Sequence, residues 1–246
     1  MKRFTVKKHV IPALLIAAIA ATALFLAFSQ ESKRHISFLG DSITTYEGYS
    51  DSADYNSTLA DNLTYYRAGS LDLDDTWWYQ VVKGLRGKLC VNNSCSASRV
   101  TDTKPGLRSG VEGASQLHNK NEQKPDIIII YMGTNDIANG VPLEDFADAY
   151  KDMLDVIEGE YPKAEVYCCT LLPESRTAGK DDVLAGYNEI IRTQTTEHNY
   201  GIIDFYSELT EWNYMTHTNE DGALRVHPTA EGMEMLSRIA LSSIEK

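Results

Sequence analysis

The sequence predicts an α/β fold of three layers, in which a parallel sheet of five strands lies between two layers of helices. Two observations lead to this prediction. Short apolar runs bounded by turn residues alternate with longer segments whose apolar residues recur every three to four positions. One run, 127–132, is apolar throughout, as expected for a parallel strand that helices cover on both faces. Strands and helices that alternate in this way form a parallel sheet joined by right-handed crossovers.

The expected strands are short, and helix-length segments separate most of them. Strands are predicted at 36–39, 89–91, 127–132, 164–172 and 201–205. Helices are predicted at 77–85, 142–161, 182–197 and from 228 onward. The clearest helix carries Phe146, Tyr150 and Ile157 on one face, and Pro142 suits its first turn. The segment 46–75 shows neither apolar period and predicts a long loop.

The N-terminal segment differs in composition from the rest of the 246-residue chain. Four basic residues among the first eight positions precede the uncharged run 10–28, which is the pattern of an export signal. These nineteen residues are also long enough to span a bilayer as an uncleaved anchor. We therefore expect residues 1–29 to form a signal peptide or an N-terminal membrane anchor. Residues 30–246 are expected to form one exported domain that is secreted, periplasmic or held at the cell surface.

The charge of the chain excludes some classes of partner. The first 30 residues contain four basic and no acidic side chains, so without them the formal net charge falls from −12 to −16. An acidic surface disfavours nucleic acid and anionic membranes. A membrane is therefore an expected partner only through an uncleaved N-terminal segment.

The four cysteines are too few and too unevenly spaced to predict a disulfide framework, although export leaves a bridge chemically feasible. They are Cys90, Cys95, Cys168 and Cys169. The last two lie in an apolar run, where we expect them to be small buried side chains. The absence of Cys-x-x-Cys and His-x-x-x-His spacings gives no reason to expect a zinc site, and no cofactor is expected.

Polar residues follow the expected strands at their carboxyl ends. Gly40-Asp41-Ser42 follows the first strand, the loop 92–98 the second, and Gly133-Thr134-Asn135-Asp136 the third, while His227-Pro228 opens the last helix. The carboxyl ends of parallel strands share one edge of the sheet, where α/β proteins bind their ligands. Ser42, Asn135 and His227 are thus expected to meet there.

At this point the chain resembles the SGNH or GDSL hydrolase family, whose four blocks match these four clusters in order. The resemblance covers about residue 36 to the C-terminus and implies a flavodoxin-like arrangement of the sheet. It also implies an oxyanion hole formed by the backbone N–H groups of Ser42 and Ala97 and by the amide of Asn135. The family usually has glycine where this chain has Ala97; because a backbone N–H is what the oxyanion hole requires, alanine can serve there if its φ is negative.

The residues also support a nucleophilic mechanism on chemical grounds. A free serine hydroxyl is a poor nucleophile, and His227 could take the proton of Ser42 and later return it to a leaving alcohol. The remaining histidines of the expected domain lack a comparable strand-end setting and are expected to be surface or packing residues: His35, His118, His198 and His217.

The third member of a catalytic triad is not obvious from the sequence. The family usually places aspartate three residues before the histidine, where this chain has Leu224. Asp221 is the expected partner of His227 if the extra residues form a bulged loop, and Glu220 is its neighbour. A backbone carbonyl that orients His227 would instead leave a Ser-His dyad. Asp41 and Asp136 are expected to fix their own turns.

The expected function is that of an exported serine esterase, and the resemblance implies ester substrates such as O-acetyl groups on polysaccharide or oligosaccharide. The tyrosine-rich loop 46–66 and the pair Trp77-Trp78 could form a sugar-binding surface, but for at least one of the two tryptophans burial in the core is the role that we expect. A lipase or thioesterase of the same family is an alternative. A non-catalytic carbohydrate-binding protein is another, because a fold does not determine function.

Overall fold

The computed structural model describes residues 33–50, 64–102 and 108–245. The chain divides into two units, 1–33 and 34–246, and all described helices and strands belong to the second. The expected export segment 1–29 and most of the expected loop 46–66 lie outside the described residues.

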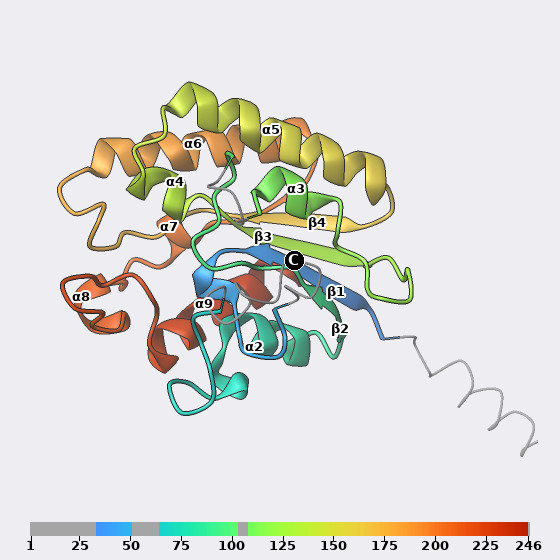
Figure 1. Cartoon of the computed structure of the whole chain (residues 1–246), viewed down its shortest axis with the longest axis horizontal. Coiled ribbons are helices and arrows are strands. Elements are labelled where there is room, and N and C mark those ends of the chain that lie inside the picture. The colour runs from blue at the N-terminus through green and yellow to red at the C-terminus, as the bar shows by residue number, and fades with distance from the viewer. Residues whose placement is uncertain (1–32, 51–63, 103–107, 246) are drawn as a thin grey trace, which may run out of the picture. The chain divides into compact units, whose positions relative to one another are not determined.

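The centre of this unit is a sheet of five parallel strands in the order β2-β1-β3-β4-β5 (Figure 1). The strands are His35–Gly40 (β1), Lys88–Asn92 (β2), Ile127–Tyr131 (β3), Glu165–Cys169 (β4) and Gly201–Ile203 (β5). The predicted α/β fold with five parallel strands is confirmed. β5 is shorter than predicted because the side chain of Asp204 accepts a hydrogen bond from the backbone N–H of Ser207 and caps a helix there.

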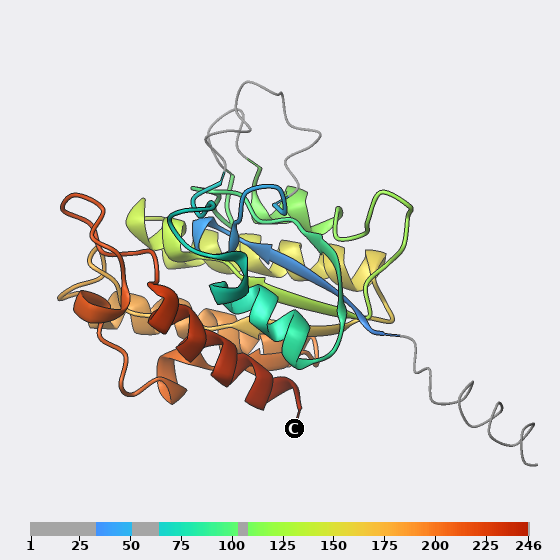
Figure 2. The same ribbon diagram turned by 90° about the horizontal axis from the view of Figure 1, so that it is seen from below.

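Helices cover both faces of the sheet. Gly110–Ala114 (α3), Leu143–Glu160 (α5) and Asp181–Glu197 (α6) lie on one face, and Trp77–Gly84 (α2) and Ala230–Ile244 (α9) lie side by side on the other (Figures 1 and 2). Short helices occupy the connections: Ser42–Thr44 (η1), Leu73–Asp75 (η3), Thr134–Ala138 (α4), Phe205–Glu208 (α7) and Tyr214–His217 (α8). The four helices predicted from periodicity are present, and the short ones were not predicted.

The core lies on both faces of β3, whose residues 127–130 are fully buried. Trp77 and Trp78 of α2 are also fully buried and pack around Phe38 of β1, with ring centroids 5.6 and 5.8 Å away. The expected burial of at least one tryptophan in the core is therefore confirmed, and the suggestion that the pair forms a sugar-binding surface is wrong. Burial of two large aromatic rings against the sheet stabilises the fold instead.

The four cysteines are all buried and none forms a disulfide. Cys168 and Cys169 in β4 are fully buried, as predicted. Burial raises the pKa of both thiols, so they are uncharged at neutral pH.

The order of the strands reverses between β1 and β3. From β1 the chain crosses to β2 on one side and then returns to β3 on the other, so the carboxyl ends of β1 and β3 lie side by side. Gly40 pairs with Tyr131 at these ends. Such a switch point is where ligands bind in open α/β sheets, and Ser42 and Asn135 follow it directly.

The helices of the described ranges include none with both the length and the apolar character needed to cross a membrane.

Candidate active site

Ser42 stands at the first position of the short helix η1, which Asp41 separates from the end of β1. The side chain of Asp41 accepts a hydrogen bond from the backbone N–H of Ile43 at 2.9 Å and so holds the turn. A Cβ at Gly40 would come within 2.6 Å of Oγ1 of Thr44, so this position requires glycine. The Gly-Asp-Ser sequence thus places the serine hydroxyl at the edge of the sheet.

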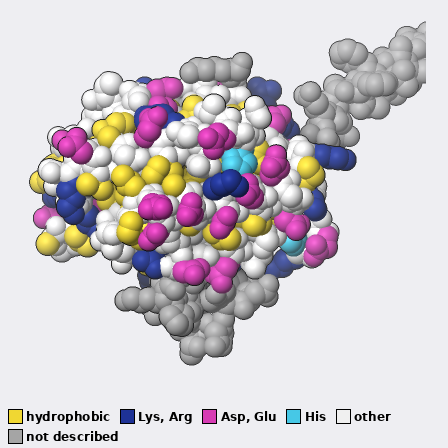
Figure 3. All heavy atoms as spheres, turned by 90° about the horizontal axis from the view of Figure 1, so that it is seen from above, with side chains coloured by type: hydrophobic (Ala, Val, Ile, Leu, Met, Phe, Trp, Pro, Cys, Tyr) yellow, Lys and Arg dark blue, Asp and Glu magenta, His cyan; other side chains and the backbone are white. Residues whose placement is uncertain are grey.

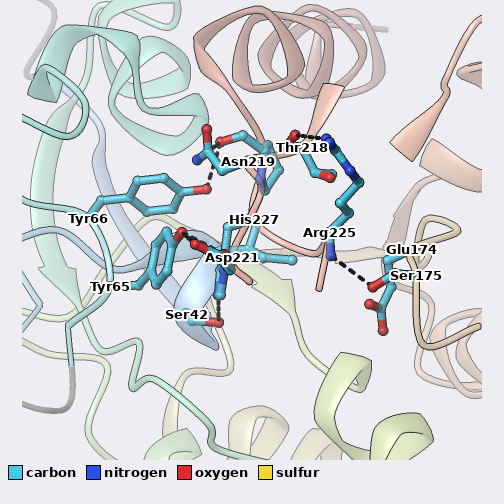
Figure 4. Close-up of polar contacts among 12 residues, drawn as sticks. Ser42, Tyr65, Tyr66, Glu174, Ser175, Thr218, Asn219, Asp221, Arg225 and His227 are labelled. Carbon is cyan, nitrogen blue, oxygen red and sulfur yellow. Dashed lines mark hydrogen bonds and ion pairs between the residues drawn. The ribbon is translucent and has the colours of Figure 1, made fainter. Parts of the chain in front are cut away.

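His227 lies beside Ser42, although 185 residues separate them in sequence. Its Nε2 is 2.9 Å from Oγ of Ser42, a hydrogen-bonding distance (Figure 4). His227 precedes α9, whose N-terminus is capped by the side chain of Thr229. The start of this helix therefore fixes the backbone that carries the imidazole.

Asp221 is the carboxylate that contacts His227. Its Oδ2 is 2.7 Å from Nδ1 of the imidazole. Asp221 and Leu224 exchange backbone hydrogen bonds of 2.9 and 3.1 Å, and Gly222 between them has φ 63°. The extra residues noted in the sequence form this tight turn, which returns the chain toward His227. Glu220 instead forms an ion pair with Arg225 at 3.3 Å.

Tyr65 covers the imidazole and was not identified from the sequence. Its ring stacks on His227 with centroids 3.4 Å apart and planes 15° from parallel. Its hydroxyl donates to the carboxylate of Asp221, with oxygen–oxygen distances of 2.6 and 2.7 Å (Figure 4). No local pattern in the sequence singles out Tyr65, because its partners are 156 and more positions away.

The surroundings of His227 favour the neutral imidazole. Burial is the main cause that lowers its pKa below the ordinary value of 6.5, and the charge of Arg176 acts in the same direction. The hydrogen bond and charge of Asp221 oppose this shift. A neutral Nε2 next to Ser42 can accept the hydroxyl proton at neutral pH, as a general base must.

The loop 92–98 lies against the end of β1 and brings Ala97 to the site. The side chain of Asn92 donates to the carbonyl of Thr44 at 2.7 Å, and the backbone N–H of Cys95 donates to the carbonyl of Gly40 at 3.0 Å. Ala97 has φ 62°, so the condition of a negative φ is not met. The residue occupies the left-handed region, which costs an L-amino acid about 1 kcal/mol or more.

Asn135 is held with its amide in one orientation. Its Nδ2 donates to the carbonyl of Ser98 at 2.9 Å, and its Oδ1 accepts from Nη1 of Arg176 at 3.3 Å. A carbonyl can only accept and a guanidinium can only donate. The two bonds therefore determine which atom of the Asn135 amide is Nδ2 and which is Oδ1. The second N–H of Nδ2 has no partner among the described residues and is available to a ligand.

Arg176 was not identified from the sequence either. Its Nε donates to Oε1 of Glu174 at 2.7 Å, and Glu174 is 4% exposed. This buried carboxylate directs the guanidinium toward Asn135. Because no apolar period or family block includes the segment 173–177, only the folded chain reveals these two residues.

The two aspartates beside these motifs have different structural roles. Asp41 fixes its own turn, as predicted, but Asp136 does not. The carboxylate of Asp136 accepts from the backbone N–H groups of Val100 and Thr101 at 2.9 and 3.1 Å and from the Thr101 hydroxyl. Asp136 therefore joins the loop that carries Ala97 to the helix that carries Asn135.

A pocket of about 150 Å³ opens over these residues. Ser42, Ala97, Asn135, Arg176, Leu224 and His227 belong to its lining. The backbone N–H groups of Ser42 and Ala97 donate to no other residue of the described ranges. With the free N–H of Asn135, three donors are thus available near the hydroxyl of Ser42.

One group in the described ranges has the composition of a metal site, and it is not part of this pocket. The side chains of Asp155, Glu158 and His198 approach within 4.8 Å of one another. Nε2 of His198 already lies 3.0 Å from a carboxylate oxygen of Asp155, and its Nδ1 lies 2.7 Å from the carbonyl of Gln194. An ion pair on an acidic surface accounts for this group.

A profile of the GDSL-like lipase/acylhydrolase family matches residues 38–235, which span all of the site residues described above. The chain belongs to this family. The similarity to the SGNH or GDSL hydrolases noted in the sequence is confirmed, and membership of the family supports an enzyme that hydrolyses esters.

Two similar proteins illustrate this relationship. A multidomain esterase of Ruminococcus flavefaciens is 27% identical over 144 residues, which are 57% of this chain and 18% of the esterase. This chain therefore spans less than a fifth of that relative. A protein described as a GDSL-like lipase from Bacteroides ovatus is 26% identical with a TM-score of 0.66, covering 87% of this chain and 99% of the other.

A second similar structure shares the fold. It is an active-site mutant of a family two carbohydrate esterase from Clostridium thermocellum, 17% identical, with a TM-score of 0.58. The match covers 86% of this chain and 63% of that protein. At this low sequence identity, the similarity shows that the two proteins share a fold and shows nothing further about this chain.

Proposed function

We propose that this protein is an exported serine esterase that removes short acyl groups, foremost acetyl, from carbohydrate. The observation that carries the proposal is the hydrogen-bonded series Ser42, His227 and Asp221, with distances of 2.9 and 2.7 Å. A nucleophile, a base and a carboxylate that orients the base are the parts of a serine hydrolase triad.

The proposed reaction has two halves. Nε2 of His227 takes the proton of the Ser42 hydroxyl while Oγ forms a bond to the carbonyl carbon of the ester. The resulting imidazolium gives this proton to the leaving alcohol oxygen as the carbon–oxygen bond of the ester breaks, which leaves an acyl group on Ser42. Water then attacks this acyl group with His227 again as base, and the products are a carboxylic acid and free Ser42.

Negative charge develops on the carbonyl oxygen in both halves. The backbone N–H groups of Ser42 and Ala97 and the free N–H of Asn135 are the donors proposed to receive it. Donors that are already oriented before the reaction stabilise such charge strongly. Hydrogen bonds to Ser98 and Arg176 orient Asn135 in this way.

The size and lining of the pocket support a short acyl group on a polar substrate. Its volume of about 150 Å³ is below the roughly 300–1,000 Å³ of pockets that enclose drug-sized ligands. An acetyl group fits such a space, and a long acyl chain would project beyond it. Arg176 and Asn135 in the lining suit a hydroxylated alcohol such as a sugar. A lipase or thioesterase of the family stays the alternative.

Carbohydrate as the substrate is supported further by the relatives and by the charge. One relative is a multidomain esterase, and one structure of the same fold is a carbohydrate esterase. On the face formed by α5 and α6, acidic side chains surround a band of hydrophobic ones (Figure 3). Such a surface suits a neutral polysaccharide better than nucleic acid or an anionic membrane.

The test uses the purified protein with p-nitrophenyl acetate, butyrate, octanoate and palmitate, and with an acetylated polysaccharide. We expect kcat/KM to fall as the acyl chain lengthens and acetate to be released from the polysaccharide. Ser42→Ala should lower kcat by about 10⁶, and a serine-directed phosphonate should label the parent once, on Ser42. A preference for palmitate would indicate a lipase or thioesterase. Absence of both turnover and labelling would indicate a binding protein.

A further inference from the structure

Tyr65 touches two members of the proposed triad at the same time. The stack on His227 and the hydrogen bond to Asp221 are made by the ring and the hydroxyl of one side chain. The backbone of Tyr65 is anchored as well, because its N–H donates to Oγ1 of Thr45 at 2.9 Å. The hydroxyl of Thr45 in turn donates to the carbonyl of Ser42 at 2.9 Å. Tyr65 is thereby tied to the turn that carries the nucleophile.

Asp221 depends on such a contact because little else holds it. The turn from Asp221 to Leu224 makes its backbone hydrogen bonds within itself, and the side chain of Leu224 is exposed. In the described part of the chain, the carboxylate of Asp221 has hydrogen bonds only with Tyr65 and His227. Without Tyr65, the imidazole alone would restrain a partly exposed carboxylate with freely rotating side-chain torsions.

The stack restrains the imidazole in a different way. A ring plane 3.4 Å away and nearly parallel leaves the imidazole no room to turn about its bond to Cβ. This orientation keeps Nδ1 toward Asp221 and Nε2 toward Ser42. The ring also excludes water from one face of His227, which agrees with burial as the main cause of its lowered pKa.

We infer that Tyr65 is a positioning residue of the esterase site: its hydroxyl holds the Asp221 carboxylate on Nδ1 of His227, and its ring holds the plane of the imidazole. The inference rests on the proposed function for its kinetic consequences, but the geometry it describes can be tested without turnover. In the family a short spacing in sequence holds the aspartate beside the histidine. This chain lacks that spacing, and the contact from Tyr65, which lies far away in sequence, holds Asp221 in place instead.

The hydroxyl is tested with Tyr65→Phe, which keeps the ring. We expect kcat on p-nitrophenyl acetate to fall about tenfold with KM within twofold, because a charge-assisted hydrogen bond to Asp221 is lost. In the Asp221→Asn background the same change should alter kcat by less than twofold. A tenfold loss in both backgrounds would overturn the inference, since the hydroxyl would then act independently of Asp221.

The ring is tested with Tyr65→Leu. This variant should lower kcat further than Tyr65→Phe and should still lower it several-fold in the Asp221→Asn background, since the stack contacts His227 directly. Equal kcat values for Tyr65→Leu and Tyr65→Phe would show that the ring does not hold the plane of the imidazole, and would overturn that part of the inference. Far-ultraviolet circular dichroism confirms that each variant is folded.

The third measurement needs no substrate. NMR titration of the His227 ring protons, assigned with His227→Gln, should give a lower pKa in Tyr65→Phe than in the parent, because a displaced Asp221 no longer favours the imidazolium. The matched control is Tyr66→Phe, which removes a neighbouring hydroxyl bonded to the carbonyl of Pro228 at 2.8 Å and should leave this pKa unchanged. An unchanged or raised pKa in Tyr65→Phe would overturn the inference, even if the protein proves not to be an esterase.

Discussion

The guanidinium of Arg176 donates a hydrogen bond to the side-chain oxygen of Asn135 at 3.3 Å, while the amide nitrogen of Asn135 donates to the carbonyl of Ser98 at 2.9 Å. Together these bonds fix the orientation of the Asn135 amide, which lines the same pocket as Ser42. The donor that the sequence indicated is therefore oriented by an arginine that the sequence did not indicate. Glu174, buried and 2.7 Å from Nε, holds the arginine in turn.

Substitutions at Asn135 and Arg176 should affect catalysis in the same way but to different extents. Asn135→Ala should lower kcat by about 10² to 10³ with little change in KM, because its N–H meets charge that exists only in the transition state. Arg176→Gln should lower kcat by less, since it only loosens the amide. Steady-state kinetics on p-nitrophenyl acetate measures both. A change confined to KM would make the residue a binding group for the substrate.

Asp221→Asn and Glu220→Gln separate the two acids near His227. Asp221→Asn should lower kcat by up to about 10⁴, because the carboxylate fixes the imidazole and stabilises its protonated form. It should also lower the pKa of His227, so the rise of activity with pH should shift to lower pH. The control is Glu220→Gln. Glu220 forms an ion pair with Arg225 and does not contact His227, so this substitution should change neither kcat nor the pKa of His227. If both variants kept parental kinetics, Asp221 would have no part in the reaction.

Ala97→Gly should stabilise the protein. Alanine at φ 62° is strained, and glycine adopts this conformation freely, although its greater freedom in the unfolded chain offsets part of the gain. We expect a gain of up to about 1 kcal/mol in the free energy of unfolding, measured by denaturation with urea, and retained activity because the backbone N–H remains.

The control for Ala97→Gly is Ala149→Gly in α5. At a helical position glycine costs about 1 kcal/mol relative to alanine, so the sign of the change should be opposite. Destabilisation by both substitutions would contradict the strain at Ala97.

Asp41→Asn should stabilise the protein at neutral pH. Burial raises the pKa of Asp41 from its ordinary value of 3.8 to about 6, so the folded protein disfavours the charged form. Below pH 4 the protonated carboxyl of Asp41 does not lower the free energy of unfolding. As the pH rises through 6 and the carboxyl becomes charged, it lowers the free energy of unfolding by up to about 3 kcal/mol. Asparagine keeps an acceptor for the N–H of Ile43 without the charge.

Urea denaturation of parent and Asp41→Asn at pH 4, 5, 6 and 7.5 measures this effect. The difference in the free energy of unfolding should be small at pH 4 and largest at pH 7.5. A buried acid such as Glu174 titrates in both proteins and cancels from the difference, whereas the charge of Asp136 acts on Asp41 and is part of the effect that the difference measures. A difference that did not vary with pH would show that the carboxyl of Asp41 does not titrate in this range.

The predictions from sequence were most accurate where the signal is local. The apolar run 127–132 and the face of Phe146, Tyr150 and Ile157 predicted β3 and α5 to within one or two residues. Boundaries were less accurate where side-chain caps decide them. Asp204, for example, caps α7 and so ends β5 earlier than the apolar run 201–205 predicts.

The amino-acid pattern was enough to predict the fold class and the meeting of Ser42, Asn135 and His227, because periodicity specifies strands and helices and parallel strands bring their carboxyl ends to one edge. The folded domain was needed to show that Asp221 rather than Glu220 contacts His227, that Tyr65 stacks on the imidazole, and that Arg176 orients Asn135. These contacts join residues 6 to 185 positions apart through turns and packing. A linear pattern records which residues are available, but the positions of their side chains follow from the packing of the whole domain.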